Sequence, residues 1–454
     1  RRVAPPRDAR GLALAVLRRV RAESAFADVV LAHALQSAQL SATDAALATQ
    51  LVYGVLAWQG RLDHHLTQLV RIPLDRLDAG VREALQLGVF QLLFLRVPAY
   101  AAVDTTVALV REVAGGGAAG MANAILRRIT RAGQGDLPLP SPTRDPLARL
   151  AVEWSHPRWL VERWASEFGA DALPALLAAH NQPGEVTLRA NLRRTDRDAL
   201  ARTLAAAGVP TRTARFAPAG LVVDGPAARV RQTAAFRDGA CSFQGEVSQL
   251  VVALLDPQPG DRVLDLCAAP GGKATAIAEQ VGATGHVVAS DLRLTGARRI
   301  RAAAARLGVA VDPVVLDAAT TASPLAPVFD RVLVDAPCSG LGTLRRHPEV
   351  RWRRTAADVA TLARLQLAIL QRAAGGLNAN GTLVYAVCTR THDETDAVIA
   401  AFLDTTPGFA LDDPTPHVPD AVVRDGALRT MPFSHDLDGF FAVRLRRAGA
   451  PQDH

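Results

Sequence analysis

Lysine is almost absent from this chain: of its 51 basic residues, 50 are arginine, and Lys273 is the only lysine. Cysteine is also scarce, because four residues in 454 are too few for the disulfide framework that stabilises many secreted proteins. No uninterrupted apolar run reaches the roughly 18–20 residues of a membrane span, and the opening residues lack the pattern of a secretory leader. We therefore expect a cytoplasmic protein that does not enter a membrane.

The length and the charge distribution both indicate a multidomain chain. A single hydrophobic core stops growing at roughly 250–300 residues, so 454 residues predict two or three domains. Residues 1–150 carry 18 basic and 12 acidic side chains, a net charge of +6, and residues 151–240 carry 12 and 9, a net charge of +3. Residues 241–454 carry 21 and 23, a net charge of −2. A basic front half fits a polyanion-binding module joined to a catalytic domain, although an ordinary solvated surface would give the same charge.

The spacing of apolar residues divides the chain into three predicted domains. Residues 1–138 show helical spacing throughout, interrupted by Pro98 and by the glycine run at 115–117. Residues 148–240 mix helices and a strand, as a small α+β subdomain does. In residues 241–448 short strands alternate with Ala-rich helices, which indicates a parallel, doubly wound α/β sheet. Helices are expected at 11–20, 45–58, 81–95, 157–168, 171–180 and 198–207, and strands at 186–192, 262–266, 286–290, 311–316, 331–334 and 382–387.

A glycine-rich turn in the predicted sheet is the first candidate ligand site. Residues 263–273 run from a strand through a Gly-Gly turn into a helix, which lets a ligand approach the backbone closely. Such a turn alone is a weak signal. Asp291 strengthens it, because it follows Gly271 by 20 residues at the end of the next strand, where an acid can accept hydrogen bonds from ribose hydroxyls. Asp317 and Asp335 end two further strands; one such acid could be a helix cap, but several at one edge indicate a site.

Two of the cysteines are predicted to lie at the same edge of the sheet. Cys338 follows one strand in the segment Asp-Ala-Pro-Cys, and Cys388 closes another in Tyr-Ala-Val-Cys. A buried cysteine is often only a small hydrophobic residue, and that interpretation suits Cys241. It suits Cys338 and Cys388 less well, because residues just past a strand end line the ligand crevice. Neither thiol has a second Cys or His at ligand spacing, so no metal site is expected.

Three motifs resemble the S-adenosylmethionine-dependent RNA cytosine-5 methyltransferases of the Nop2/Sun (Fmu) family. They are Asp-Leu-Cys-Ala-Ala-Pro-Gly-Gly-Lys at 265–273, Asp-Ala-Pro-Cys-Ser-Gly at 335–340, and the Tyr-x-x-Cys segment at 385–388. Their order and spacing agree with the family, and the segments Arg-Arg-His-Pro-Glu at 345–349 and Asp-Gly-Phe-Phe at 438–441 fit as well. The resemblance implies a Rossmann-like methyltransferase domain.

The resemblance extends to the front of the chain. Residues 96–103 and 121–127 look like the RNA-binding domain of the antitermination factor NusB, and residues 181–183 and 188–191 look like a linking subdomain. A NusB-like front on this methyltransferase is the arrangement of the bacterial small-subunit ribosomal RNA methyltransferase B (RsmB) group. The implied partner is 16S ribosomal RNA, before or early in 30S assembly, and the implied state is a monomer.

The resemblance also assigns roles to single residues. S-adenosylmethionine would be the cofactor, with Asp291 at its ribose and Asp317 at its adenine side. Cys388 would add to carbon 6 of the cytosine, Cys338 would assist product release, and Asp335 would face the target base, where a protonated carboxyl would hydrogen-bond N3. The residues that would line the methyl donor are Cys267, Ala268, Ala269, Pro270, Gly271, Gly272 and Lys273, together with Asp335.

Departures from the family pattern affect local geometry but leave the reaction class unchanged. Val387 and Thr389 stand where the family usually has Thr and Ser, Thr395 replaces an Asn, and Gly245 replaces an acid.

Two rival functions remain open at this point. One is cytosine-5 methylation of transfer RNA by the same chemistry, and the other is a non-catalytic RNA-binding assembly or antitermination factor, which the basic front half would suit equally.

Overall fold

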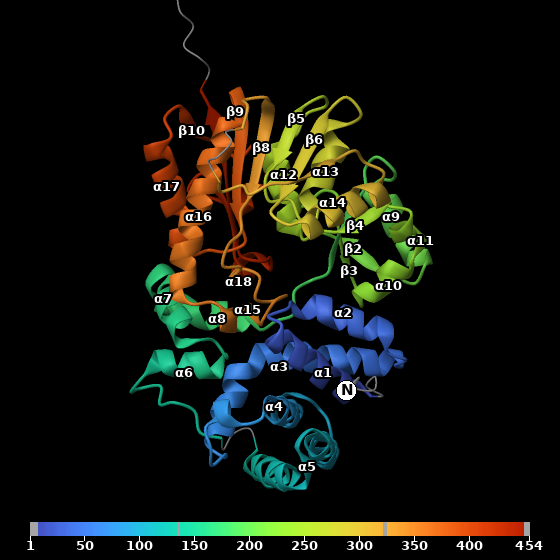
Figure 1. Cartoon of the computed structure of the whole chain (residues 1–454), viewed down its shortest axis with the longest axis vertical. Helices are drawn as coiled ribbons and strands as arrows, with labels where there is room; N and C mark the ends of the chain where they lie inside the picture. Colours follow the sequence, from blue (N-terminus) through green and yellow to red (C-terminus); the bar gives the residue numbers. More distant parts are fainter. Residues whose placement is uncertain (1–7, 134–136, 321–324, 449–454) are drawn as a thin grey trace, which may run out of the picture. The chain divides into compact units, whose positions relative to one another are not determined.

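The computed structural model describes residues 8–133, 137–320 and 325–448, and these form two compact units (Figure 1). Unit 1 contains the chain up to Gln182 together with Leu344–Arg353, and unit 2 contains Pro183–Thr343 and the chain from Arg354 onward. The predicted domain ranges 1–138, 148–240 and 241–448 divide the sequence at other positions and stay predictions.

Unit 1 is built from helices throughout its described residues. The expected helices at 11–20 and 45–58 lie within α1 and α3, and the helix expected at 81–95 is α4, which ends one residue earlier, at Phe94. α5 begins after Pro98 and is interrupted at Gly115, whose φ of +81° lies in the region that favours glycine. The helices of this unit are α1 (Ala9–Ala22), α2 (Ala27–Ser37), α3 (Ala42–Thr67), α4 (Ala79–Phe94), α5 (Ala99–Ala132), α6 (Pro146–Glu153), α7 (Arg158–Phe168), α8 (Leu173–His180) and α15 (Val350–Arg353), with short 3-10 helices η1 (Leu74–Arg76) and η2 (Ala170–Ala172).

Unit 1 includes a segment that comes from far along the chain, Leu344–Arg353. Arg351 in this segment is fully buried and donates hydrogen bonds to the carbonyl of Ser155 (3.1 Å), the carbonyl of His180 (3.2 Å) and Oδ1 of Asn181 (2.8 Å). Burial lowers the pKa of Arg351 to about 9 despite the opposing charge of Glu349. The segment is therefore an integral part of the helical unit.

Unit 2 contains a small antiparallel sheet with the strand order β2-β3-β1-β4. The strand expected at 186–192 is β1, and the helix expected at 198–207 is α9. Cys241 is buried in the core of this subdomain, and burial raises its pKa to about 11, as expected for a cysteine that only packs. The elements are β1 (Thr187–Ala190), α9 (Arg197–Ala206), β2 (Thr211–Thr213), β3 (Gly220–Val223), α10 (Ala227–Gln232), α11 (Ala234–Arg237) and β4 (Cys241–Phe243).

The large sheet of unit 2 has the strand order β11-β12-β13-β9-β8-β5-β6-β7, with β10 paired to β13. All five expected strands are present as β5–β9, and their pairings are parallel. The sheet is nevertheless mixed, because β10–β13 pair in antiparallel fashion and were not predicted. The strands are β5 (Arg262–Asp265), β6 (His286–Asp291), β7 (Asp312–Val315), β8 (Phe329–Asp335), β9 (Leu377–Val387), β10 (Phe409–Asp412), β11 (Val423–Arg424), β12 (Ala427–Thr430) and β13 (Phe440–Arg447).

Helices cover both faces of this sheet (Figure 1). Along β8, Val332 and Val334 face the core under α16 and α17, whereas Leu333 faces the core under α12 and α13. Within the described residues, no helix is both long and apolar enough to cross a membrane. The helices are α12 (Glu246–Leu255), α13 (Gly272–Val281), α14 (Leu294–Leu307), α16 (Ala356–Gly375), α17 (Asp396–Thr405) and α18 (Pro432–His435), with 3-10 helices η3 (His392–Glu394) and η4 (Asp420–Val422).

Candidate active site

The carboxyl ends of the parallel strands bring the predicted site residues to one edge of the large sheet. Asp291 is the last residue of β6, Asp335 is the last residue of β8, and Cys388 is the first residue after β9. Asp317 follows β7 by two residues, and its carboxylate accepts a hydrogen bond from the backbone nitrogen of Ala319 (2.9 Å). Among the described residues, no hydrogen bond or ion pair joins the Asp317 side chain to the other site residues.

The glycine-rich turn joins β5 to α13 and is fixed to β6. The backbone nitrogen of Ala268 donates to the carbonyl of Ser290 (2.8 Å), and the Ser290 hydroxyl donates to the carbonyl of Leu266 (2.6 Å). Gly271 has a φ of +106°, a conformation that side chains rarely adopt, and α13 begins at Gly272. The turn thus presents backbone nitrogens of a helix N-terminus at the edge where the acids lie.

Lys273 lies in the first turn of α13 and forms an ion pair with Asp335. Burial lowers the pKa of Lys273, but the charge and hydrogen bond of Asp335 and the fields of Asp265 and Cys388 outweigh it, so the pKa lies above its usual value. In this arrangement Asp335 accepts a hydrogen bond, whereas the sequence analysis expected a protonated carboxyl that donates one. The expected donor form of Asp335 stays a prediction for the RNA-bound protein.

Asp265 is a buried acid beside this ion pair, and the sequence analysis quoted it only as part of a motif. It is the last residue of β5 and is fully buried. Burial and the charge of Asp335 raise its pKa to about 7, against the opposing effect of Lys273. Its place at a strand end, like that of Asp291, was the signal that could have identified it.

Cys338 and Cys388 lie side by side, with 3.2 Å between their sulfur atoms. The hydrogen bond to Cys388 and burial raise the pKa of Cys338 well above its usual value. Cys338 therefore stays a thiol at neutral pH.

Glu394 connects the loop that carries Cys338 to the loop that follows Cys388. Its side chain is fully buried and accepts hydrogen bonds from the backbone nitrogen of Ser339 (2.8 Å), the Ser339 hydroxyl (2.5 Å), the Thr391 hydroxyl (2.8 Å) and Nε2 of Gln366 (3.0 Å). Tyr385 donates to the carbonyl of Glu394 (2.7 Å). Neither Ser339 nor Gln366 was predicted, because their partners are distant in sequence.

The departures from the family pattern fit their surroundings. Thr389 keeps a hydroxyl, which accepts from the Ser339 hydroxyl at 3.1 Å, and Val387 packs into the apolar core of the sheet. Thr395 bonds the carbonyl of Thr391 (2.9 Å). Gly245 precedes Glu246, whose buried carboxylate accepts a hydrogen bond from the backbone nitrogen of Ala217 (2.9 Å). None of the four replacements disturbs the cysteine pair.

The edge also offers the groups that an S-adenosylmethionine-like cofactor requires. Gly296 lies against the Asp291 carboxylate so closely that a Cβ there would collide with it. Lys273 offers a cation to the carboxylate of such a cofactor, and Asp291 offers an acid to its ribose hydroxyls. The backbone at Gly272 is open, because a Cβ there would meet nothing within 4 Å. Burial and the charges of Asp265, Asp335 and Asp291 raise the pKa of Cys267, so this thiol stays protonated. The residues present therefore fit this cofactor.

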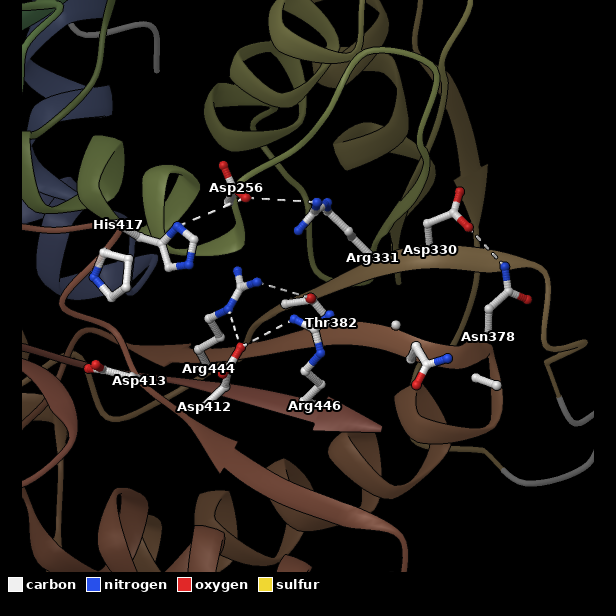
Figure 2. A pocket seen from close by; sticks show the side chains of 14 residues that line it. Asp256, Asp330, Arg331, Asn378, Thr382, Asp412, Asp413, His417, Arg444 and Arg446 are labelled. Carbon is white, nitrogen blue, oxygen red and sulfur yellow. Dashed lines mark hydrogen bonds and ion pairs between the residues drawn. The ribbon is translucent and has the colours of Figure 1, made fainter. Parts of the chain in front are cut away.

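A pocket of about 480 Å³ lies at the opposite, amino edge of the sheet (Figure 2). Several of its charged side chains have polar partners within the pocket: Arg444 donates to Asp412 (2.7 Å), and the Asn378 amide donates to Asp330 (3.0 Å). Arg331 lies 3.8 Å from Asp256. These pairings leave little net charge for a ligand, and the sheet topology places the pocket away from the strand ends that carry the cysteines.

Three known families match successive parts of the sequence. Residues 7–131 match the NusB family, residues 156–230 match the ferredoxin-like domain of RsmF/B-like methyltransferases, and residues 252–446 match the family described as 16S rRNA methyltransferase RsmB/F. A protein of Bacillus subtilis (strain 168), named probable ribosomal RNA small subunit methyltransferase B, is 36% identical over 97% of this chain and 99% of its own length. The ribosomal RNA small subunit methyltransferase B of Pseudomonas putida is 38% identical over 80% of this chain and 82% of its own length.

Solved structures share the architecture. The crystal structure of PH0851 superposes with a TM-score of 0.82 and 25% identity, covering 98% of this chain and all of that one. The structure of NSun6 from Pyrococcus horikoshii with SFG has a TM-score of 0.57 and 21% identity, covering 64% of this chain and 97% of that one. The second likeness shows the fold alone.

Proposed function

Because this chain belongs to the RsmB/F family of 16S ribosomal RNA methyltransferases, which depend on S-adenosylmethionine, we propose that it methylates carbon 5 of one cytosine through a covalent adduct on Cys388. The observation that carries this proposal is the pair of sulfur atoms 3.2 Å apart beside the ion pair of Lys273 and Asp335. A merely structural cysteine needs neither a second thiol nor a buried cation.

S-adenosylmethionine, when bound, supplies the methyl group as an electrophile. Residues 267–273 would hold it at the glycine-rich turn, with Asp291 at the ribose and Asp317 at the adenine side. The N-terminus of α13 and Lys273 both favour a carboxylate at the turn, and Gly296 leaves room for Asp291 to face a diol.

Carbon 5 of cytosine is too weak a nucleophile to accept a methyl group unaided, so a thiolate must first add to carbon 6. Cys388 is the better candidate for this addition, because the raised pKa of Cys338 keeps that thiol protonated. A new bond forms between sulfur and carbon 6, and the electron pair of the ring double bond becomes available at carbon 5. Asp335, in its protonated form, would donate a hydrogen bond to N3 and so stabilise the negative charge that this addition places on the ring.

Product release reverses the addition and requires two proton movements. The proton on carbon 5 must leave, the double bond between carbons 5 and 6 reforms, and the bond from carbon 6 to the Cys388 sulfur breaks. Cys338 can give its proton to the departing sulfur across the 3.2 Å contact and, as a strongly basic thiolate, take the carbon 5 proton. Both cysteines then end the cycle as thiols, and Cys388 releases its proton to solvent before it adds to the next cytosine.

The substrate we propose is 16S ribosomal RNA, before or early in 30S assembly, bound by a monomer. The names of the relatives from Bacillus subtilis and Pseudomonas putida support ribosomal RNA over transfer RNA. The match of residues 7–131 to the NusB family and their basic charge support RNA binding by the front of the chain. The target base must be unpaired or flipped out to reach Cys388, which favours RNA that is not yet folded into the subunit.

The test is methylation of in vitro transcribed 16S ribosomal RNA by the purified full chain with labelled S-adenosylmethionine, followed by nuclease digestion and mass spectrometry. The proposal predicts 5-methylcytidine at one position, and none with the Cys388→Ala variant. Label in total transfer RNA but not in 16S RNA would favour the transfer RNA alternative. RNA binding without any methyl transfer would favour a non-catalytic assembly factor.

A further inference from the structure

A second pocket in unit 2, of about 400 Å³, is lined mainly by basic side chains. We call it the arginine pocket and define it by Arg215, Phe216, Arg390, Arg424, Arg429 and His435. Arg215 and Phe216 come from the loop between β2 and β3 of the small subdomain, and the others come from the methyltransferase fold. Its volume lies within the range of ligand pockets, roughly 300–1,000 Å³.

The arginine pocket carries an excess of positive charge. Its lining contains four arginines and one acid, Asp425. Arg429 is neutralised by Asp396, to which it donates two hydrogen bonds of 2.9 and 2.5 Å. Among the residues that the structure describes, neither Arg215 nor Arg424 has an acidic side chain within ion-pair distance. In the pocket at the amino edge of the sheet, by comparison, Arg331 and Arg444 each have an acidic partner. Of these two pockets, the arginine pocket is therefore the one that would attract an anion.

The walls of the pocket are fixed before any ligand arrives. The Arg215 guanidinium lies 4.9 Å from the centre of the Phe216 ring, and the backbone nitrogen of Phe216 donates to the buried Glu246. His435 accepts from the backbone nitrogen of Met431 (3.1 Å) and lies 3.2 Å from the carbonyl of Ala421. These contacts hold the His435 ring in one orientation.

The pocket is close to the proposed nucleophile along the chain. Arg390 follows Cys388 by two residues, so their Cα atoms are at most about 7 Å apart. A cytosine that reaches Cys388 remains attached to a ribose with a phosphate on either side. A side chain two residues from Cys388 is near enough to reach one of these phosphates.

We propose that the arginine pocket binds a backbone phosphate that flanks the target cytosine, with Arg215 and Arg424 as its principal ligands. This inference rests on the proposed function for the identity of the RNA. Guanidinium groups suit the task, because each presents a planar fork of donors to phosphate oxygens. The contact positions the strand and carries no sequence information.

The first experiment compares the full chain with the double variant Arg215→Ala/Arg424→Ala and with Arg202→Ala/Arg364→Ala, a control that removes the same charge from exposed positions on α9 and α16. We expect the pocket variant to lower the slope of log Kd for 16S RNA against log salt by about 1 and to raise KM about tenfold. Arg215→Lys/Arg424→Lys should retain the slope. Equal behaviour of the pocket and control variants would overturn the proposal. Unchanged S-adenosylmethionine affinity by calorimetry shows that each variant is folded.

The second experiment locates the phosphate. On a synthetic RNA hairpin centred on the methylated cytosine, one flanking phosphate at a time is replaced by a neutral methylphosphonate. One replacement should raise KM for the wild-type chain about tenfold and leave KM of the pocket variant unchanged, because both changes remove the same contact. Independent, additive losses at both phosphates would refute the assignment. A wild-type chain that methylates no cytosine of 16S RNA would refute the proposed function, while the salt slope would still test the pocket.

Discussion

Glu394 accepts hydrogen bonds from both the backbone nitrogen and the hydroxyl of Ser339, so one buried carboxylate ties the loop of Cys338 to the loop of Cys388. We therefore regard Glu394 as a positioning residue for the cysteine pair. Two of its four hydrogen bonds come from N–H groups, which can only donate, and the other two come from the hydroxyls of Ser339 and Thr391.

Glu394→Gln should lower kcat about a hundredfold with a smaller change in KM, because an amide accepts at one atom only and forces the two hydroxyl hydrogen bonds to reverse, so the two sulfur atoms lose their alignment. Steady-state kinetics with 16S RNA measure this split. Ser339→Ala removes one hydroxyl but keeps the backbone contact. Its kcat should lie between that of Glu394→Gln and that of the wild type. A Glu394→Gln enzyme with normal kcat and a lowered melting temperature would show that Glu394 serves stability alone.

Asp265 should make the fold less stable as the pH rises. Its pKa of about 7 in the folded protein lies above the ordinary value near 4, so the folded state holds a proton that the unfolded chain has already lost between those pH values. The resulting loss in the free energy of unfolding grows from pH 4 to 7 and is complete above pH 7, where it is at most on the order of 4 kcal/mol. Urea unfolding should show Asp265→Asn gaining stability over wild type between pH 5 and 8. A constant difference across that range would contradict the assignment.

Lys273→Arg should weaken S-adenosylmethionine binding about tenfold while the fold stays intact. The lysine side chain is only 12% exposed and pairs with Asp335, and a planar guanidinium is wider than an ammonium group. Isothermal calorimetry gives the affinity directly. Arg262→Lys, at the opposite edge of the sheet, is the control and should bind the cofactor as wild type does. Unchanged affinity in Lys273→Arg would remove the explanation for the single lysine.

Arg351→Ala should destabilise unit 1 by about 3 kcal/mol, because it leaves the carbonyls of Ser155 and His180 without their donor and opens a cavity. Hydrogen exchange of the full chain would detect faster exchange in α7 and α8. Arg351→Met keeps most of the volume and should recover part of the loss. If exchange were unaffected in both variants, residues 344–353 would not be integral to the helical unit.

The sequence predicted the parallel strands and the strand-end acids because both depend on local patterns. Runs of Val and Leu followed by a small or acidic residue identify β5, β6 and β8 without any knowledge of their partners. The order of the motifs also predicted that Cys338 and Cys388 share one edge. The 3.2 Å contact between them depends on packing and could not be predicted from spacing.

The features that the sequence did not predict depend on long-range pairing. β13 inserts between β9 and β12, and its burial in the sheet interior hides any alternation of polar and apolar residues. Residues 344–353 belong to the helical unit only through contacts with residues more than 160 positions away, such as that of Arg351 with Asn181. The raised pKa of Asp265 likewise comes from its burial in the folded sheet and from the charge of Asp335 on the neighbouring β8.

The most direct test of the central claim is a denaturing gel of each cysteine variant incubated with 16S RNA and S-adenosylmethionine. Cys388→Ala cannot begin the reaction and should give neither product nor a covalent complex. In the Cys338→Ala variant, Cys388 should still add to carbon 6 and the methyl group should still be transferred. Elimination should then stall and leave a slow-migrating band of protein bound to RNA. A covalent band from Cys388→Ala, or none from Cys338→Ala, would contradict the assignment of Cys388 as the nucleophile.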